Sequence, residues 1–146
     1  MKKGIDAPGV CVVFYCHDGK GNFIMGKRSK TVRDERGGWD LGGGVIEFGE
    51  TAEEALKREI KEEYGTGILQ FEFLGYRDAL RVDHNKNKTH WVALDFKVLI
   101  NREKIQNNAP DALEEIGWFT LDNLPTPIHS QMPIFLKKYK KRLVAK

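Results

Sequence analysis

Residues 51–65 constrain the fold of this chain more than any other stretch, because they specify a helix at both of its ends. Thr51 and Glu54, three positions apart, form a capping-box pattern at the start of a run of strong helix formers. Gly65 stands where a glycine commonly ends a helix. The pattern therefore predicts a helix from Ala52 to Tyr64.

This helix has two chemically different stripes, since residues three and four positions apart lie on the same side. The apolar stripe predicts packing against a sheet, and it consists of Ala52, Ala55, Leu56 and Ile60. The acidic stripe consists of Glu59, Glu62 and Glu63. Carboxylates near a helix C-terminus repel one another and oppose the helix dipole, so we expect a cation to compensate them.

The acidic stripe has two interpretations. A solvated, charge-rich helix face is the usual explanation for a helix of this composition. The three glycines at positions 42–44 favour a metal site instead, because glycine lets the backbone bend and approach other groups closely, at an entropic cost that a simple connector rarely needs. Hard carboxylate oxygens suit Mg²⁺ or Mn²⁺, which also keep waters and substrate phosphates among their ligands.

The same stretch resembles the motif of the Nudix (MutT-type) hydrolases, GX5EX7REUXEEXGU, in which U is a bulky aliphatic residue. All the fixed residues are present, and they are Gly44, Glu50, Arg58, Glu59, Ile60, Glu62, Glu63 and Gly65. Only the last position departs from the motif, because Thr66 stands there. The resemblance covers essentially the whole chain and implies one Nudix hydrolase domain over residues 1–146.

The other patterns predict an α/β fold. Strands are expected at residues 10–16, 23–27, 45–47, 68–76, 90–100 and 114–119. The first two strands should form a hairpin, and a final helix should follow Ser130 as its N-cap. Strands before and after one helix, with a second helix at the end, predict an α/β/α layered arrangement around a mixed sheet. The resemblance implies the same Nudix fold.

The resemblance implies an enzyme, a divalent-metal-dependent Nudix pyrophosphohydrolase that cleaves a phosphoanhydride bond in a nucleoside diphosphate linked to another moiety. It assigns the catalytic roles to Glu62, Glu63, Arg58 and Glu50. Arg58 is expected to orient Glu50 through a salt bridge. The number of metal ions and the choice of general base stay open.

The implied metal ligands for Mg²⁺ or Mn²⁺ are Glu59, Glu62, Glu63 and Glu115. Glu115 is included because, in some relatives, an acidic residue before the last strand joins the metal ligands. Glu114 is the alternative at that place.

Substrate contacts are expected from basic and glycine residues before the helix, and the candidates are Arg28, Arg36, Trp39, Gly43 and Gly44. Four aromatic residues are candidates for base or sugar recognition, and they are Trp39, Phe48, Tyr76 and Trp91. Many relatives read Trp-x-Leu-Pro-Gly-Gly near position 39. Gly42 replaces the proline in this chain, and we expect it to loosen the loop.

Substrate choice is open at this level. Relatives specific for ADP-ribose often carry a proline about fifteen residues beyond the motif, and relatives acting on diadenosine polyphosphates carry a tyrosine slightly further on. Arg81 and Asp83 occupy those positions here. A (d)NTP, an oxidised nucleotide, ADP-ribose or a nucleotide sugar all remain candidates. The alternative function is a non-catalytic, nucleotide-binding regulatory domain, which the complete set of glutamates disfavours.

Composition bounds the partners and the compartment. Six of the 24 lysines and arginines lie in residues 137–146, and the rest of the chain carries 18 basic against 21 acidic residues. A solvated helix end explains that tail better than a nucleic-acid-binding segment does.

No apolar run is long enough for a membrane span or a secretory signal, which predicts a cytoplasmic protein. Cys11 and Cys16 are expected to be buried, unpaired thiols. A homodimer is left open.

Overall fold

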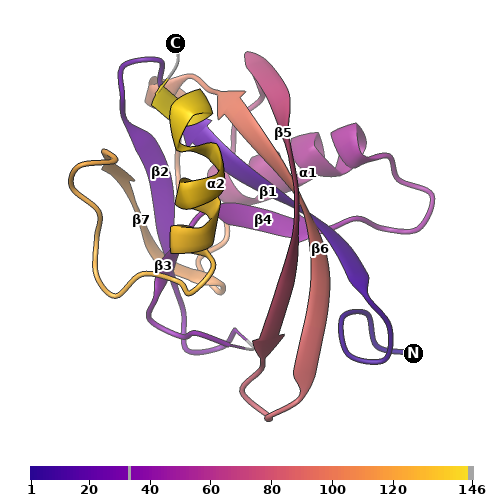
Figure 1. Cartoon of the computed structure of the whole chain (residues 1–146). Helices are drawn as coiled ribbons and strands as arrows, with labels where there is room; N and C mark the ends of the chain where they lie inside the picture. The colour runs from indigo at the N-terminus through magenta and orange to yellow at the C-terminus, as the bar shows by residue number, and fades with distance from the viewer. Residues whose placement is uncertain (33, 145–146) are drawn as a thin grey trace.

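A seven-stranded mixed sheet organises the chain in the computed structural model, which describes residues 1–32 and 34–144 (Figure 1). In chain order the elements are β1 (Gly9–His17), β2 (Phe23–Arg28), β3 (Trp39–Asp40), β4 (Gly42–Val45), α1 (Ala52–Tyr64), β5 (Gln70–Val82), β6 (Lys88–Leu99), the short 3₁₀ helix η1 (Arg102–Lys104), β7 (Leu113–Phe119) and α2 (Met132–Val144).

The sheet follows the order β3-β2-β1-β6-β5, with β4 also paired to β1 and β7 to β2. The β1 and β6 strands run parallel, and all the other pairs are antiparallel, so the predicted mixed sheet is confirmed. The predicted hairpin of β1 and β2 is short, because these two strands pair only where His17 lies opposite Phe23. Along the rest of its length β1 pairs with β4 and β6.

One helix covers each face of the sheet, which confirms the α/β/α layers (Figure 1). Alternate residues of β1 point to opposite faces, as a strand requires. Phe14 packs in the cluster that contains Leu56 and Ile60 of α1. Tyr15 packs in the second cluster, with Phe135 of α2.

The α1 helix matches its prediction at both ends. Its Thr51 side chain accepts a hydrogen bond from the N–H of Glu54, and the Glu54 side chain accepts one from the N–H of Thr51. Gly65 ends the helix in the left-handed conformation, with a φ of 69°. Four residues of its inner face are buried, and they are Ala55, Leu56, Ile60 and Tyr64.

The glycines before α1 were expected to let the backbone bend, with Gly42 loosening a loop. Residues 42–44 instead belong to strand β4. A Cβ atom on Gly42 would lie 2.2 Å from a ring carbon of Phe14. On Gly43 it would lie 2.6 Å from the carbonyl oxygen of Val12. The expectation of close approach is thus confirmed, whereas the expected bend is wrong.

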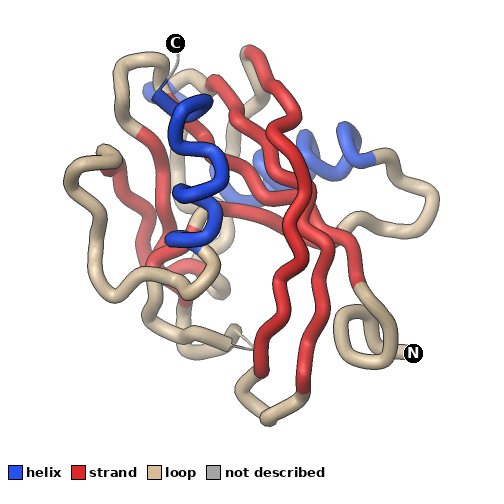
Figure 2. The backbone as a smooth tube through the Cα atoms, in the orientation of Figure 1, coloured by secondary structure: helices blue, strands red, loops and turns tan. Residues whose placement is uncertain are grey.

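The β5 and β6 strands are longer than predicted, and Figure 2 shows them running side by side. Their register shifts between Phe73 and Gly75, a bulge that interrupts the apolar alternation and hides the true length of β5 in the sequence. The described residues contain no helix that is both long enough and apolar enough to cross a membrane.

Three smaller predictions have mixed outcomes. Ser130 does not cap α2, since its hydroxyl donates to Glu35 and the helix begins only at Met132. Neither Cys11 nor Cys16 forms a disulfide among the described residues, but Cys11 is only partly buried, whereas both were expected to be buried. The basic C-terminal segment was expected to be a solvated helix end. At least one of its side chains also supports the fold, because Arg142 donates a hydrogen bond to the carbonyl oxygen of Leu74 at 2.7 Å. Residues 145 and 146 lie outside the described residues.

Candidate active site

Arg58 connects the carboxylates of α1. Its guanidinium donates two hydrogen bonds to Glu50, from Nε at 2.7 Å and from Nη2 at 3.0 Å. Nη1 donates to Glu59 at 2.7 Å and to Glu62 at 3.3 Å, and Nη2 also reaches the carbonyl oxygen of Val45 at 3.0 Å. The hydrogen bonds from Arg58 lower the pKa of Glu50 to about 2. The predicted salt bridge between Arg58 and Glu50 is therefore present.

Glu59 and Glu63 behave in the opposite way, because burial raises the pKa of both side chains. For Glu63 the charge of Glu59 adds to the rise, while the N–H of Gly43 donates a hydrogen bond at 3.2 Å and opposes it. A Cβ atom on Gly44 would lie 2.0 Å from the carboxyl carbon of Glu59. The glycine therefore makes the space that the Glu59 carboxylate occupies.

These residues fit a divalent cation. Two partly buried carboxyl groups resist ionisation side by side, and a nearby cation would remove that cost. In the described part of the chain, no three His, Cys, Asp or Glu side chains already surround a common ion position. The side chain of Glu59 is instead hydrogen-bonded to Arg58, and Glu62 is exposed at the edge of the cluster.

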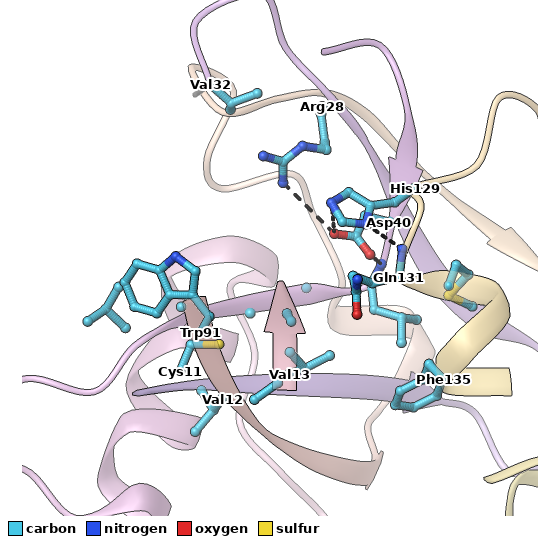
Figure 3. Close-up of a pocket in the computed structure, with 18 of the residues that line it drawn as sticks. Cys11, Val12, Val13, Arg28, Val32, Asp40, Trp91, His129, Gln131 and Phe135 are labelled. Carbon is cyan, nitrogen blue, oxygen red and sulfur yellow. Dashed lines mark hydrogen bonds and ion pairs between the residues drawn. The ribbon is translucent and has the colours of Figure 1, made fainter. Parts of the chain in front are cut away.

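A cavity of about 240 Å³ borders this cluster and includes Gly43, Gly44 and Glu63 among its lining residues (Figure 3). Its apolar walls come from β1, β5, β6 and α2, and they include Val13, Ala79, Trp91, Ala93 and Phe135. Its polar lining residues are Arg28, Asp40, Arg77, Arg81, His129 and Gln131. The cavity thus combines apolar walls with polar and charged groups, as expected for a small-molecule site.

Arg77 lies under one side of the cavity in a buried ion pair. Its guanidinium donates to both carboxylate oxygens of Asp95, at 2.7 and 2.8 Å, and the Tyr139 hydroxyl donates to the same carboxylate at 2.7 Å. Nη1 of Arg77 donates to Oε1 of Gln131 at 3.2 Å. This network joins β5, β6 and α2 behind the cavity wall.

A second network lies at the polar end of the cavity. Arg28 pairs with Asp34 at 2.7 Å, and Arg81 lies 2.7 Å from the same carboxylate. His129 lies 2.8 Å from Nη1 of Arg81 and 3.0 Å from Glu35. Burial lowers the pKa of His129, which keeps its imidazole neutral at pH 7. Both of its ring nitrogens are engaged, because Nδ1 accepts the N–H of Gln131 at 3.1 Å.

The predicted substrate residues divide into two groups. Arg28, Gly43 and Gly44 line the cavity, together with the candidate aromatic Trp91. The other predicted residues lie elsewhere. Trp39 packs edge-on against Phe119, while Arg36 is exposed and bonds the carbonyl of Val32.

Phe48 and Tyr76 are exposed, and neither lines the cavity. Glu115 is exposed on β7, where it lies opposite Lys27 in the ladder, and Glu114 pairs with Lys27 at 3.6 Å.

The sequence patterns did not identify most of the polar cavity residues, namely Asp40, Arg77, Arg81, His129 and Gln131. A signal existed for the Arg77 and Asp95 pair, since each is a charged residue inside an apolar strand pattern. A charge on the inner face of a strand predicts a buried partner or a site. His129 and Gln131 carry no comparable pattern, because they lie in the turn before α2.

A family model for the NUDIX domain matches residues 6–139 of this chain. The chain therefore belongs to the Nudix family, and its class is that of the Nudix pyrophosphohydrolases. Enzymes of this family generally use divalent metal ions.

Individual relatives agree with this assignment. Nucleoside triphosphatase NudI of Enterobacter sp. (strain 638) is 35% identical over 96 residues, which cover 62% of this chain and 67% of the relative. NudI of Escherichia coli O139:H28 is 29% identical over 108 residues, covering 70% of this chain and 73% of the relative.

Solved structures show the same fold. The MutT NUDIX hydrolase of Burkholderia pseudomallei aligns with a TM-score of 0.76 and 31% identity, over 90% of this chain and 97% of that one. The NUDIX domain of Shewanella oneidensis NrtR, solved with ADP ribose, aligns with a TM-score of 0.74 and 20% identity, over 94% of this chain and 90% of that one. At that identity the second likeness concerns the fold alone.

Proposed function

We propose that this chain is a divalent-metal-dependent nucleoside triphosphate pyrophosphohydrolase. The observation that carries the proposal is the position of the cavity, which is lined by Glu63 of the acidic cluster and by Gly43 and Gly44, the glycines that contact Glu63 and Glu59. A nucleotide bound in the cavity would thus present its phosphates to the carboxylates. The similarity to proteins named nucleoside triphosphatase supports a triphosphate over the other nucleoside diphosphate derivatives.

In this proposal, Glu59, Glu62 and Glu63 hold Mg²⁺ or Mn²⁺, and Arg58 holds Glu50 and Glu59 in place. The bound cation would supply charge neutralisation for the phosphates and would acidify water. The partly buried carboxyl of Glu63, with its raised pKa, suits a group that binds a proton or a cation in turn. Glu115, which the family resemblance implies, is the proposed additional ligand.

The remaining residues of the cavity position the substrate. Phosphoryl chemistry depends mainly on orientation and charge stabilisation, so a rigid enclosure is sufficient for much of the task. The buried pair of Arg77 and Asp95 keeps one wall rigid. Arg28 has its Nη1 free of hydrogen bonds to the described residues, so it is available to a bound nucleotide.

The test is product analysis after incubation with (d)NTPs, oxidised nucleotides, ADP-ribose, nucleotide sugars and dinucleoside polyphosphates. Each substrate is tried with Mg²⁺, with Mn²⁺ and with EDTA. We expect nucleoside monophosphate and pyrophosphate from a triphosphate, with either metal and not with EDTA. Cleavage confined to ADP-ribose or a nucleotide sugar would move the proposal to that class. Nucleotide binding without cleavage of any compound would favour a regulatory domain.

A further inference from the structure

Asp40 presents an unused hydrogen-bond acceptor to the cavity. One oxygen of its carboxylate, Oδ1, accepts the N–H of Leu41 at 2.8 Å. The other oxygen, Oδ2, lies 3.7 Å from Nε2 of His129 and 3.9 Å from Nη1 of Arg28. Both distances exceed a hydrogen bond, so among the described residues no donor is bonded to Oδ2, and of its two neighbours only Arg28 is charged. Figure 3 shows the carboxylate between these two side chains.

Gln131 presents an unused donor to the same cavity, and its orientation is fixed. Arg77 has donors only, so the side-chain atom of Gln131 that faces it at 3.2 Å must be the amide oxygen. Arg77 cannot turn away, because two hydrogen bonds hold it to the fully buried Asp95. The amide NH₂ of Gln131 must therefore face elsewhere, and no described residue accepts a hydrogen bond from it.

The charge of Asp40 decides which part of a nucleotide belongs beside it. The proposed cation lies at the carboxylates of α1, so the phosphates would bind beside Gly43 and Glu63, where that cation compensates them, and Asp40 has no such compensation for a phosphate. The base is neutral and carries N–H groups that a carboxylate accepts. Apolar side chains, Trp91 and Phe135 among them, enclose the space between.

We propose that Asp40 and Gln131 together read the Watson–Crick edge of the substrate's base. This inference rests on the proposed function. Asp40 Oδ2 accepts an N–H of the base, and the amide of Gln131 donates to the ring nitrogen or carbonyl oxygen beside it. Every standard base has such a donor and acceptor side by side on that edge. The enzyme therefore takes a free nucleotide with an exposed edge, and it rejects a nucleotide whose edge is methylated or base-paired.

The first test needs no mutation. Turnover of UTP and GTP is compared with that of N3-methyl-UTP and N1-methyl-GTP, in which a methyl group replaces the ring N–H. We expect kcat/KM to fall by about tenfold or more on methylation, because a buried acceptor loses its donor. Equal kcat/KM for each nucleotide and its methylated form would overturn the inference.

The second test locates the effect at Asp40. In Asp40→Ala, the preference for UTP over N3-methyl-UTP should fall to within about threefold, because the acceptor is gone. The loss of kcat/KM should be at least about tenfold larger for UTP than for ribose 5-triphosphate, which has no base. An equal loss on both compounds would place Asp40 at the phosphates or in the fold and would overturn the inference.

Failure of the proposed function gives a different result. If wild-type protein cleaves no triphosphate with Mg²⁺ or Mn²⁺, calorimetric titration with UTP and N3-methyl-UTP still measures recognition of the edge. Tighter binding of UTP by about tenfold or more would retain the inference without the hydrolytic function. Equal binding, or binding of neither compound, would overturn it.

Discussion

The acidic face of α1 and the cavity beside it are built from contacts of very different reach along the chain. The hydrogen bonds that join Arg58 to Glu50, Glu59 and Glu62 span eight residues or fewer. Those of the cavity span 18 residues between Arg77 and Asp95, and 48 between Arg81 and His129. The first region follows from one segment of sequence, whereas the second exists only once the sheet and α2 have assembled.

This difference assigns separate properties to the two regions. The cluster on α1 contains carboxyl groups with raised pKa values, which is costly without a cation and useful with one. The cavity contains charges that are already paired, such as Arg77 with Asp95 and Arg28 with Asp34. Damage to the cluster should therefore reduce the reaction and spare the fold. Damage to the paired charges of the cavity should reduce the stability of the fold as well.

The largest effect is expected at Glu63. Glu63→Gln keeps the volume of the side chain but removes one ligand charge, so turnover should fall by about a thousandfold, or about 4 kcal/mol of activation free energy. The circular dichroism spectrum should not change, because the contacts of α1 with the sheet stay intact. Glu53→Gln is the matched control, since Glu53 is exposed and, among the described residues, forms an ion pair with Lys57 alone, at 3.2 Å. Comparable turnover for the wild type and Glu63→Gln would remove Glu63 from the site.

The next effect is on folding and comes from the cavity wall. Asp95→Ala leaves the buried guanidinium of Arg77 without its carboxylate, which should cost about 3 kcal/mol of unfolding free energy. Asp78→Ala provides the comparison, because Asp78 forms an exposed pair with His90 and should cost less than about 1 kcal/mol. Urea titrations of both variants measure the difference. Similar midpoints for the two variants would show that the buried pair does not stabilise the cavity wall.

A smaller effect is expected where the two regions meet. In Gly44→Ala the new Cβ atom would occupy the position of the Glu59 carboxylate, which must move. A displaced ligand should lower kcat by about tenfold. Gly67→Ala is the control, because nothing lies within 4 Å of a Cβ atom there and the backbone is not left-handed. If kcat is the same in Gly44→Ala and in that control, the Glu59 carboxylate can move without any effect on the reaction.

The same contrast explains how much the sequence predicted. The bounds of α1 and its cap residues depend on local patterns, and they are confirmed. The pair of Arg58 and Glu50, which the family resemblance implied, is also present. The three glycines at 42–44 were identified as important, but their strand conformation depends on pairing with residues 12–14 of β1, which are distant in sequence. Local propensity alone would not assign a strand to three glycines.

Most of the cavity residues could not be predicted from the sequence, for a related reason. His129 and Gln131 reach the site because the turn before α2 is held by Glu35, which accepts hydrogen bonds from the N–H and the hydroxyl of Ser130, both at 2.7 Å. No periodicity links residue 35 to residue 130. The sequence contained one usable signal, the charged residues inside the β5 and β6 patterns, which include Arg77, Arg81 and Asp95.

The smallest effect is a pH dependence of stability, and it comes from the carboxyl groups of the α1 cluster. Burial raises the pKa of Glu59 and Glu63 in the folded chain above the value of about 4.3 expected in the unfolded chain. Without a metal ion, the free energy of unfolding should therefore fall as pH rises through these raised pKa values. Glu50, whose pKa is about 2, acts oppositely: its stabilising effect is present above pH 4.3 and is lost as pH falls toward 2.

A divalent cation should offset the cost of ionising Glu59 and Glu63, so the rise in Tm on adding Mg²⁺ should be larger at pH 8 than at pH 5. Thermal unfolding by calorimetry, with Mg²⁺ and with EDTA, measures both shifts, and Glu63→Gln should show a weaker dependence on pH. A rise in Tm that is equal at both pH values, or larger at pH 5, would mean that the cation binds somewhere other than these two carboxylates.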